Sequence, residues 1–502
     1  MTWADFRALA PMLWPVVAVL LLMLRRRRSP ERGYGGSFVI AVGGLSMGFV
    51  QLAWLWQTGS VSDLGAGLLQ ADPLGLFAGA LVFASAGVAL VVGVDDLDRR
   101  RRRRPEFEVL LLLSVLGALV ALQSRNLLVI ALGLEIFGIC AHTLTGFYRQ
   151  RVLSLEAATK SLLMGSFGTC LLLFGAALVF GACGSLELAD LGEAAVSGTM
   201  NSLAVLGVGF VVAGFAIALG AVPFHFWLPD VLQGSPIPVS AYRGVVGLCL
   251  GGILFTRLLF ELNLGDAENV REFLWWLAAV TLATGSLGAL AQNDLRRLLG
   301  YLTVAQVGHL LVAVASMRQG ANCQTAVEAL LVTLLAHAIA VLGAFTALAV
   351  MEAELRRPVV REDLAAIGKR HPYLAGAFAL FAASLAGLPG TVGFLGRLLE
   401  IRAAIETSRQ QADESFMLLA ILGIVAGVVG LYAALAVSIR FAAPVAADRP
   451  GTILVRERPR AAVSVLVAFL LALCVLYGSG MAFLGIGVEP ALAWIEKAAR
   501  LY

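Results

Sequence analysis

The stretch GFAIALGAVPFHFWLPDVLQGSPIPV (Gly214–Val239) is an apolar segment that proline interrupts, and FAASLAGLPGTVGFLGRLLE (Phe381–Glu400) repeats this pattern later in the chain. Proline lacks a backbone N–H and breaks a helix, so the freed backbone groups need partners in protein or water, not lipid. Paired interruptions in two halves of an apolar chain indicate an ion or substrate path near the bilayer midplane. The simpler alternative is that these prolines only kink packed helices.

The composition indicates a membrane protein. Of the 502 residues, 59% are hydrophobic and 14% are charged, and the mean hydropathy is +0.87. A soluble protein carries about 25% charged residues. We predict an all-α polytopic membrane protein of about fourteen transmembrane helices, because apolar runs long enough to span a bilayer recur along the chain. The runs lie near residues 8–24, 36–56, 73–94, 107–123, 126–147, 157–180, 201–226, 238–260, 272–291, 296–316, 325–351, 373–401, 416–440 and 462–486. The first run is followed by RRRRSPER and not by a small-residue cleavage site. We therefore expect it to be a retained membrane span and not a signal peptide.

Arginine-rich loops alternate with loops that are poor in basic residues. The basic loops hold Arg25–Arg28, Arg99–Arg104, Arg149 and Arg151, Arg296 and Arg297, the basic residues of 356–370, and those of 440–460. The alternate loops hold Asp63 and Asp72, then Glu187, Asp190 and Glu193, then Asp266, Glu268 and Glu272. By the positive-inside rule the basic loops are cytoplasmic and both termini lie on the outer side. Each arginine run adjoins a hydrophobic span, so we interpret it as a topology determinant and expect no nucleic acid as a partner.

The sequence carries no pattern typical of a bound cofactor. Its six cysteines are scattered, mostly within the apolar runs, without the spacing of an iron–sulfur or zinc site. It contains neither a dinucleotide-binding GxGxxG with its acidic partner nor a Walker loop. We therefore expect no cofactor, metal or nucleotide. If the chain belongs to a redox enzyme, the electrons travel through other subunits.

Polar residues inside the apolar runs are the candidate site, because such residues are costly in a bilayer and are usually functional. Histidine titrates near neutral pH, and four of the five histidines lie on or beside these runs. The alternative for each is a hydrogen-bonded core residue. The predicted proton pathway consists of Glu135, Lys160, His225, Arg243, His309, His337 and Arg397.

Glu135 lies in the middle of an apolar run with no charged residue within seven positions on either side. A carboxylate at that depth is protonated or paired. We expect Lys160 or Arg243 as its partner, with Lys160 preferred. The alternative is that Lys160 extends to the cytoplasmic surface near Glu156.

Four stretches carry a family resemblance. They are VPFHFWLPDVLQGSPIPVS (222–240), LAQNDLRRLLGYLTVAQVGHLL (290–311), SLAGLPGTVGFLGR (384–397) and EAATKSLLMGSF (156–167). The sequence resembles the proton-translocating, antiporter-like membrane subunits of respiratory complex I (NADH–quinone oxidoreductase), which are related to multisubunit cation/proton antiporters. The PDVxxGxPxPV form is most similar to the N-type subunit. The resemblance covers roughly residues 100 to 440.

The resemblance implies two inverted five-helix repeats, each with one broken helix and one half-channel. It divides the chain into an N-terminal three-helix segment (1–105), a first repeat (106–262), a second repeat (263–443), and a cytoplasmic loop with the last helix (444–502). It also implies a bacterial inner membrane location and, as partners, the lipid bilayer and the other membrane subunits of a complex I-like assembly. In such an assembly this chain would be a non-catalytic subunit.

The sequence departs from the family where the chemistry is expected. Glu135 matches the family glutamate. Three family lysine positions are occupied by Ala218, Leu248 and Arg397. Alanine and leucine carry no proton, and arginine stays protonated in proteins. The resemblance therefore supports the fold more strongly than the usual proton path.

Three functional interpretations stay open at this point. The chain is a complex I N-like subunit that moves protons, coupled to quinone reduction, by a rerouted path. Alternatively, it kept the scaffold, lost conduction, and serves assembly and coupling. As a third possibility, it belongs to another assembly built on this fold: a cation/proton antiporter, a membrane-bound hydrogenase or an inorganic-carbon uptake complex.

Overall fold

The computed structural model describes residues 3–28, 35–58, 63–64, 68–99, 105–262, 268–317, 323–411, 413–444 and 461–478. Within these ranges the chain is helical, apart from turns and one antiparallel pair of two-residue strands, β1 (Asp63–Leu64) and β2 (Leu69–Gln70). Helices suit lipid because they satisfy their own backbone groups.

Eleven helical segments of the described residues are long and apolar enough to cross a membrane. Each coincides with one of the predicted apolar runs. Three shorter apolar helices (Leu9–Arg25, Pro372–Leu385 and Ala462–Val475) coincide with the three remaining runs. The predicted run at 462–486 continues beyond residue 478, outside the described residues.

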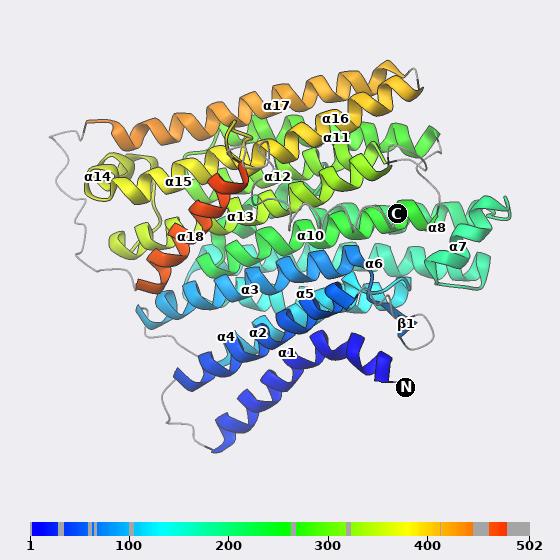
Figure 1. The fold of residues 1–502 in the computed structure, drawn as a ribbon, viewed down its shortest axis with the longest axis horizontal. Helices are drawn as coiled ribbons and strands as arrows, with labels where there is room; N and C mark the ends of the chain where they lie inside the picture. The colour runs from blue at the N-terminus through cyan, green and yellow to red at the C-terminus, as the bar shows by residue number, and fades with distance from the viewer. Residues whose placement is uncertain are drawn as a thin grey trace. The chain divides into compact units, whose positions relative to one another are not determined.

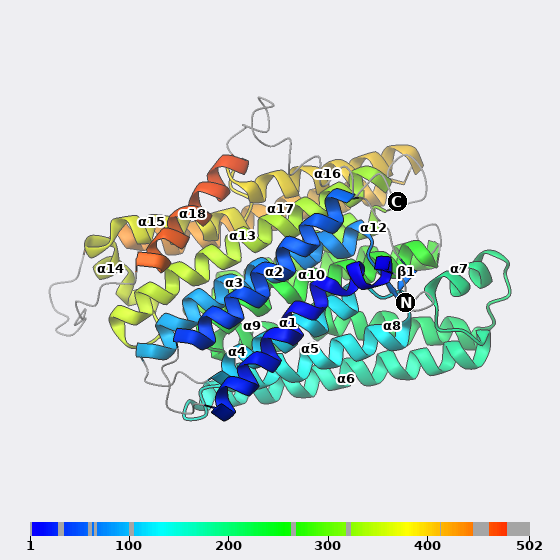
Figure 2. The ribbon, with the colours of Figure 1, turned by 60° about the horizontal axis from the view of Figure 1, so that its bottom comes forward.

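The chain forms two compact units. The first holds the described residues within 1–90, 100–220 and 234–270. Its helices are α1 (Trp3–Arg28), α2 (Gly35–Thr58), most of α3 (Pro73–Arg99), α4 (Pro105–Leu122), α5 (Leu127–Thr145), α6 (Val152–Cys183), α7 (Leu188–Val196), α8 (Ser202–Leu219) and α10 (Ile237–Glu261). Asparagine side chains cap α5 and α8 at Asn126 and Asn201. Helix α6 packs against both α5 and α8 (Figure 2).

The second unit holds the described residues within 91–99, 221–233 and 271–502. Its helices are η1 (Phe224–Phe226), α9 (Trp227–Gly234), α11 (Glu268–Leu290), α12 (Leu295–Ala315), α13 (Cys323–Leu355), η3 (Arg361–Asp363), α14 (Leu364–Arg370), α15 (Pro372–Leu385), α16 (Val392–Gln411), α17 (Glu414–Ser438), η4 (Ile439–Ala442) and α18 (Ala461–Gly478). Helix α13 packs against α12, α15, α16 and α18 (Figure 1). The apolar windows of α12 and α13 are 94% and 89% buried, so these helices form the core of the unit.

The first helix break lies between α8 and α9. Helix α8 ends at Gly220, whose positive φ of 75° suits a residue without a Cβ. Beyond it the Val222 N–H donates to the Thr281 hydroxyl at 3.2 Å, and the Phe224 N–H donates to the Ala221 carbonyl at 2.7 Å. Protein groups therefore satisfy the backbone that this break frees.

The second break lies between α15 and α16. Two glycines of positive φ, Gly387 and Gly390, turn the chain there. The carbonyl of Leu385 accepts from Arg397 Nη2 at 2.8 Å and from Gln306 Nε2 at 3.1 Å. A Cβ at Gly387 would lie 2.1 Å from Arg397 Cδ, so the absence of a side chain makes room for the guanidinium.

The orientation stays a prediction. Of the loops used to predict it, residues 100–104 and 445–460 lie outside the described residues, as do both ends of the chain. The predicted outer segment, 182–200, forms the end of α6 and the short helix α7.

Gly393, at the start of α16, tests how tightly the second break is packed. A Cβ there would lie 1.8 Å from the Ser384 carbonyl oxygen, whereas a Cβ at Gly376 on α15 would meet nothing within 4 Å. We expect Gly393→Ala to lower the melting temperature of the purified protein through a backbone clash of about 1–3 kcal/mol. The matched control Gly376→Ala should leave it unchanged or raise it, because alanine favours a helix. Equal melting temperatures for the two variants would contradict the packing.

Candidate functional site

The first unit contains a buried polar cluster on α5, α6 and α10. Arg243 Nη1 donates to the Thr145 hydroxyl at 2.8 Å and to the Ser161 hydroxyl at 2.7 Å. Ser161 Oγ lies 2.6 Å from His142 Nδ1. Because Ser161 accepts from the guanidinium, its own hydrogen is available to donate to His142. The cluster therefore links a fixed positive charge to a titratable ring through one hydroxyl.

A glycine on α6, Gly165, makes room for the His142 ring because it has no side chain. A Cβ at Gly165 would lie 2.7 Å from His142 Nε2. Arg243, Ser161 and Thr145 are buried, whereas His142 is half-buried. This histidine is therefore the accessible end of the cluster.

The expected partner of Glu135 is wrong. Lys160 lies 2.7 Å from Glu156 on its own helix, and Arg243 donates to hydroxyl groups. Within the described part of the chain Glu135 forms neither a hydrogen bond nor an ion pair, and its side chain is half-buried. A carboxylate four residues before Lys160 is the closer partner, so Lys160 pairs with Glu156 along its own helix.

The second unit contains a buried charged cluster on α12, α13 and α16. His309 Nδ1 lies 3.0 Å from Glu400 Oε2, and the Thr333 hydroxyl donates to Glu400 Oε1 at 2.5 Å. Arg397 Nη1 contacts His309 Nε2. All four side chains are buried, and the cluster adjoins the second helix break through the Arg397–Leu385 contact.

Two further predicted histidines belong to this unit. His337 is buried on α13, four residues after Thr333, so it lies one helical turn farther along the same face. His225 lies in η1, with its ring centroid 6.5 Å from that of Tyr301 on α12. His337 thus lies on the α13 face that carries Thr333, whereas His225 belongs to the first helix break.

Other charged residues are structural. Arg296 on α12 forms a buried bidentate pair with Glu352 on α13 and donates to the Gln233 carbonyl at 3.2 Å. Arg297 lies 3.2 Å from Asp230 on α9. These contacts fasten the short helix α9 to α12.

In the first unit Arg257 has the same role. This buried side chain lies 2.6 Å from Asp72 and donates to the carbonyls of Leu122 and Ser124 at 2.7 Å each. The arginine therefore holds the end of α4 and the start of α3 to α10.

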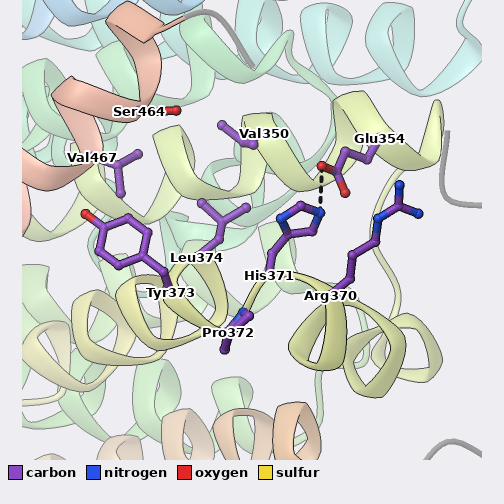
Figure 3. A pocket seen from close by; sticks show the side chains of 9 residues that line it. All are labelled: Val350, Glu354, Arg370, His371, Pro372, Tyr373, Leu374, Ser464 and Val467. Atoms are coloured by element: carbon purple, nitrogen blue, oxygen red, sulfur yellow. Dashed lines mark ion pairs between the residues drawn. The ribbon is translucent and has the colours of Figure 1, made fainter. Parts of the chain in front are cut away.

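A pocket of about 260 Å³ opens where α13 ends and α15 begins (Figure 3). His371 Nε2 lies 2.9 Å from Glu354 Oε1 across it, and Val467 on α18 closes one side. The pocket lies next to the basic loop 356–370. The predicted relay leaves out His371, as it does His142, and the structure pairs His371 with the buried carboxylate of Glu354.

The predicted pathway lacks Glu400 and His142, and it lacks the hydroxyls of Thr145, Ser161 and Thr333. Glu400 lies three residues after Arg397 on α16, a spacing that places both side chains on one helix face. This signal was present in the sequence. The hydroxyl residues gave no such signal in the sequence, because serine and threonine are common in membrane helices. Leu248 is buried on α10, and it and Ala218 supply no titratable group.

Comparisons with known proteins identify the family. The family described as NADH:quinone oxidoreductase/Mrp antiporter, TM, matches residues 124–423. NADH-quinone oxidoreductase subunit N 2 of Roseiflexus castenholzii is 34% identical over 398 residues, which cover 78% of each chain. A chain of respiratory complex I from Thermus thermophilus superposes with a TM-score of 0.74 at 27% identity, covering 94% of this chain and 98% of that one. A chain of the Mrp complex from Dietzia shares the fold, with a TM-score of 0.80 at 19% identity, covering 99% and 97%.

The chain belongs to the NADH:quinone oxidoreductase/Mrp antiporter family. It is an all-helical, multi-pass membrane protein of the antiporter-like type. The predicted family membership is confirmed.

The Arg296–Glu352 pair should dominate the stability of the second unit. We expect Glu352→Gln to cost about 3–5 kcal/mol, because it leaves a buried guanidinium without its counter-charge. The control is Glu406→Gln, which breaks the exposed Arg402–Glu406 pair of α16. It should cost at most about 1 kcal/mol. Melting curves of the two purified variants check this. A similar loss of stability in both would show that the buried pair stabilises the protein no more than the exposed pair does.

Proposed function

We propose that this chain is a proton-translocating membrane subunit of a complex I-like NADH-quinone oxidoreductase, located in a bacterial inner membrane. The observation that carries the proposal is the buried His309–Glu400–Thr333 cluster beside a helix break. A titratable ring in contact with a carboxylate inside a membrane protein can pass a proton between the two groups, as a proton relay requires. The subunit N relatives support this assembly, in which the partners are other membrane subunits and electrons travel elsewhere.

The proposed architecture has fourteen transmembrane helices and two inverted five-helix repeats. The eleven long helical segments and three shorter ones of the described residues support the number. The breaks support the repeats, because each falls in the fourth span of its set of five, after α8 and after α15. Both termini on the outer side remain part of the proposal, on the strength of the arginine-rich loops.

The proposed proton path retains the seven predicted residues. In the second unit His309 contacts both Glu400 and Arg397, and His337 lies one helical turn from Thr333 on α13. Arg243 belongs to the His142–Ser161 cluster of the first. Lys160 pairs with Glu156, His225 lies at the first helix break, and Glu135 forms no hydrogen bond among the described residues, so water would have to join these residues to the path.

A scaffold function is the second candidate, and a specific observation favours it. Ala218 and Leu248 occupy two family lysine positions, and the guanidinium at the third is engaged by His309 and by a backbone carbonyl. A subunit without those amines could fill its place in the assembly without conducting. The likeness to the Mrp complex keeps a cation/proton antiporter as a further alternative.

Purification in mild detergent, reconstitution into proteoliposomes and a pH-sensitive dye test the proposal. Quinone-site and NADH-oxidising subunits should co-purify, and substrate should drive proton uptake. Combined Glu135→Gln and His337→Ala should lower that uptake per electron about tenfold, since they remove two relay groups.

Glu406→Gln serves as the control and should pump like the parent. Unchanged pumping in the Glu135→Gln and His337→Ala variant would favour the scaffold function. Sodium-dependent exchange without an oxidoreductase would favour the antiporter.

A further inference from the structure

The hydrogen-bond donors around His309 fix where its proton lies. Guanidinium N–H groups only donate, so the contact of Arg397 Nη1 requires a lone pair on His309 Nε2. A neutral ring that accepts at Nε2 carries its proton on Nδ1. Nδ1 lies 3.0 Å from Glu400 Oε2 and donates to it. The structure therefore holds His309 as the neutral Nδ1–H tautomer.

Glu400 is held as an ionised acceptor. Its Oε2 accepts from His309, and its Oε1 accepts from the Thr333 hydroxyl at 2.5 Å. Both oxygens face donors, so this arrangement leaves no proton on the carboxyl group. Arg397, three residues earlier on the same helix, supplies the compensating charge.

Arg397 has a second contact, away from the His309 ring, that can hold it when it leaves the ring. Its Nη2 donates to the Leu385 carbonyl at the end of α15, and its Nη1 faces Gly427 on α17, where a Cβ would lie 2.8 Å away. The guanidinium is a rigid planar fork, so Nη1 leaves the ring when the whole group pivots about the contact of Nη2 with the Leu385 carbonyl. A lysine has one nitrogen and no such fork.

We propose that His309 and Glu400 form the proton-transfer pair of the second unit, and that Arg397 gates it by occupying His309 Nε2. The proposal rests on the proposed function, since it names the groups that carry the proton. The roles differ from those of the family pattern, in which the residue at position 397 is a lysine that itself carries the proton.

The step balances as follows. Arg397 Nη1 leaves Nε2, and a proton from a hydronium ion binds there, which gives the imidazolium. The Nδ1 proton then passes to Glu400 Oε2, leaving a neutral carboxyl group and a neutral ring protonated on Nε2. Glu400 then releases its proton to a water molecule and becomes a carboxylate again. The ring recovers its first tautomer through water, which takes the Nε2 proton and supplies one to Nδ1. Arg397 returns to Nε2 only after that exchange, because an N–H group there cannot accept a hydrogen bond from the guanidinium. The gate is therefore closed only when the ring is unloaded.

Nitrogen-15 magnetic resonance of histidine-labelled protein tests the tautomer without any transport assay. The chain has five histidines, so the signal that disappears in His309→Gln is assigned to His309. In the purified full chain that signal should show a proton on Nδ1 and none on Nε2. In Arg397→Met, which removes charge and donor at similar length, Nε2 should gain a proton near neutral pH. The exposed control Arg402→Gln should match the parent. A parent ring protonated on Nε2, or no change in Arg397→Met, overturns the proposal.

Transport by the reconstituted complex tests the pair. Glu400→Gln should lower pumping about tenfold, while Glu406→Gln on the same helix stays within about twofold of the parent. Arg397→Met should raise the passive proton leak in the absence of substrate, because the gate is lost. If the complex pumps and Glu400→Gln pumps like Glu406→Gln, the pair is wrong and the proposed function stands. If the parent complex does not pump, the proposed function fails, and the resonance result still decides the gate.

Discussion

The structure depends on satisfying backbone carbonyls at helix ends that lie inside the membrane-spanning bundle. Each helix leaves its last carbonyls without an internal partner, and water is not available there to replace one. Buried arginines fill this need at three helix ends, because one guanidinium offers five donors and keeps its charge. The contacts join Arg257 to the carbonyls of Leu122 and Ser124, Arg296 to that of Gln233, and Arg397 to that of Leu385. Each arginine also contacts a side chain of another helix, so a helix end and a helix pair are fixed together.

This constraint gives the arginine at position 397 a structural role, where the sequence resemblance implies a lysine. The chain holds only three lysines, and the two described ones, Lys160 and Lys369, are exposed or half-exposed. At position 397 the guanidinium reaches the Leu385 carbonyl and the His309 ring with two different nitrogens, whereas a lysine has one. The substitution removes a proton carrier and places a fixed charge beside a histidine and a carboxylate. Proton chemistry then falls to the neighbours of the charged group.

The sequence predicted the helices well, because apolar runs and proline breaks are local properties. It also placed His309, Arg397 and His337 on the correct helices. It could not show that Glu400 completes the cluster, since that depends on how α16 faces α12. The Glu135 partner failed for a related reason: the rotation of α6 decides which side Lys160 occupies, and Glu156 on the same helix satisfies it. The sequence pattern therefore predicts contacts between residues of one helix, but it does not predict which residues of two different helices meet.

The attachment of α9 to α12 has a mechanical consequence. Arg296 holds the Gln233 carbonyl of α9 and Arg297 holds Asp230, so this short helix cannot shift without pulling on the start of α12. His309 lies about 20 Å farther along the same helix, at 1.5 Å per residue. Helix α12 is almost wholly enclosed by protein and has little freedom to bend. A shift of α9 would therefore be carried along α12 toward the imidazole ring, where hydrogen bonds depend on small changes in distance.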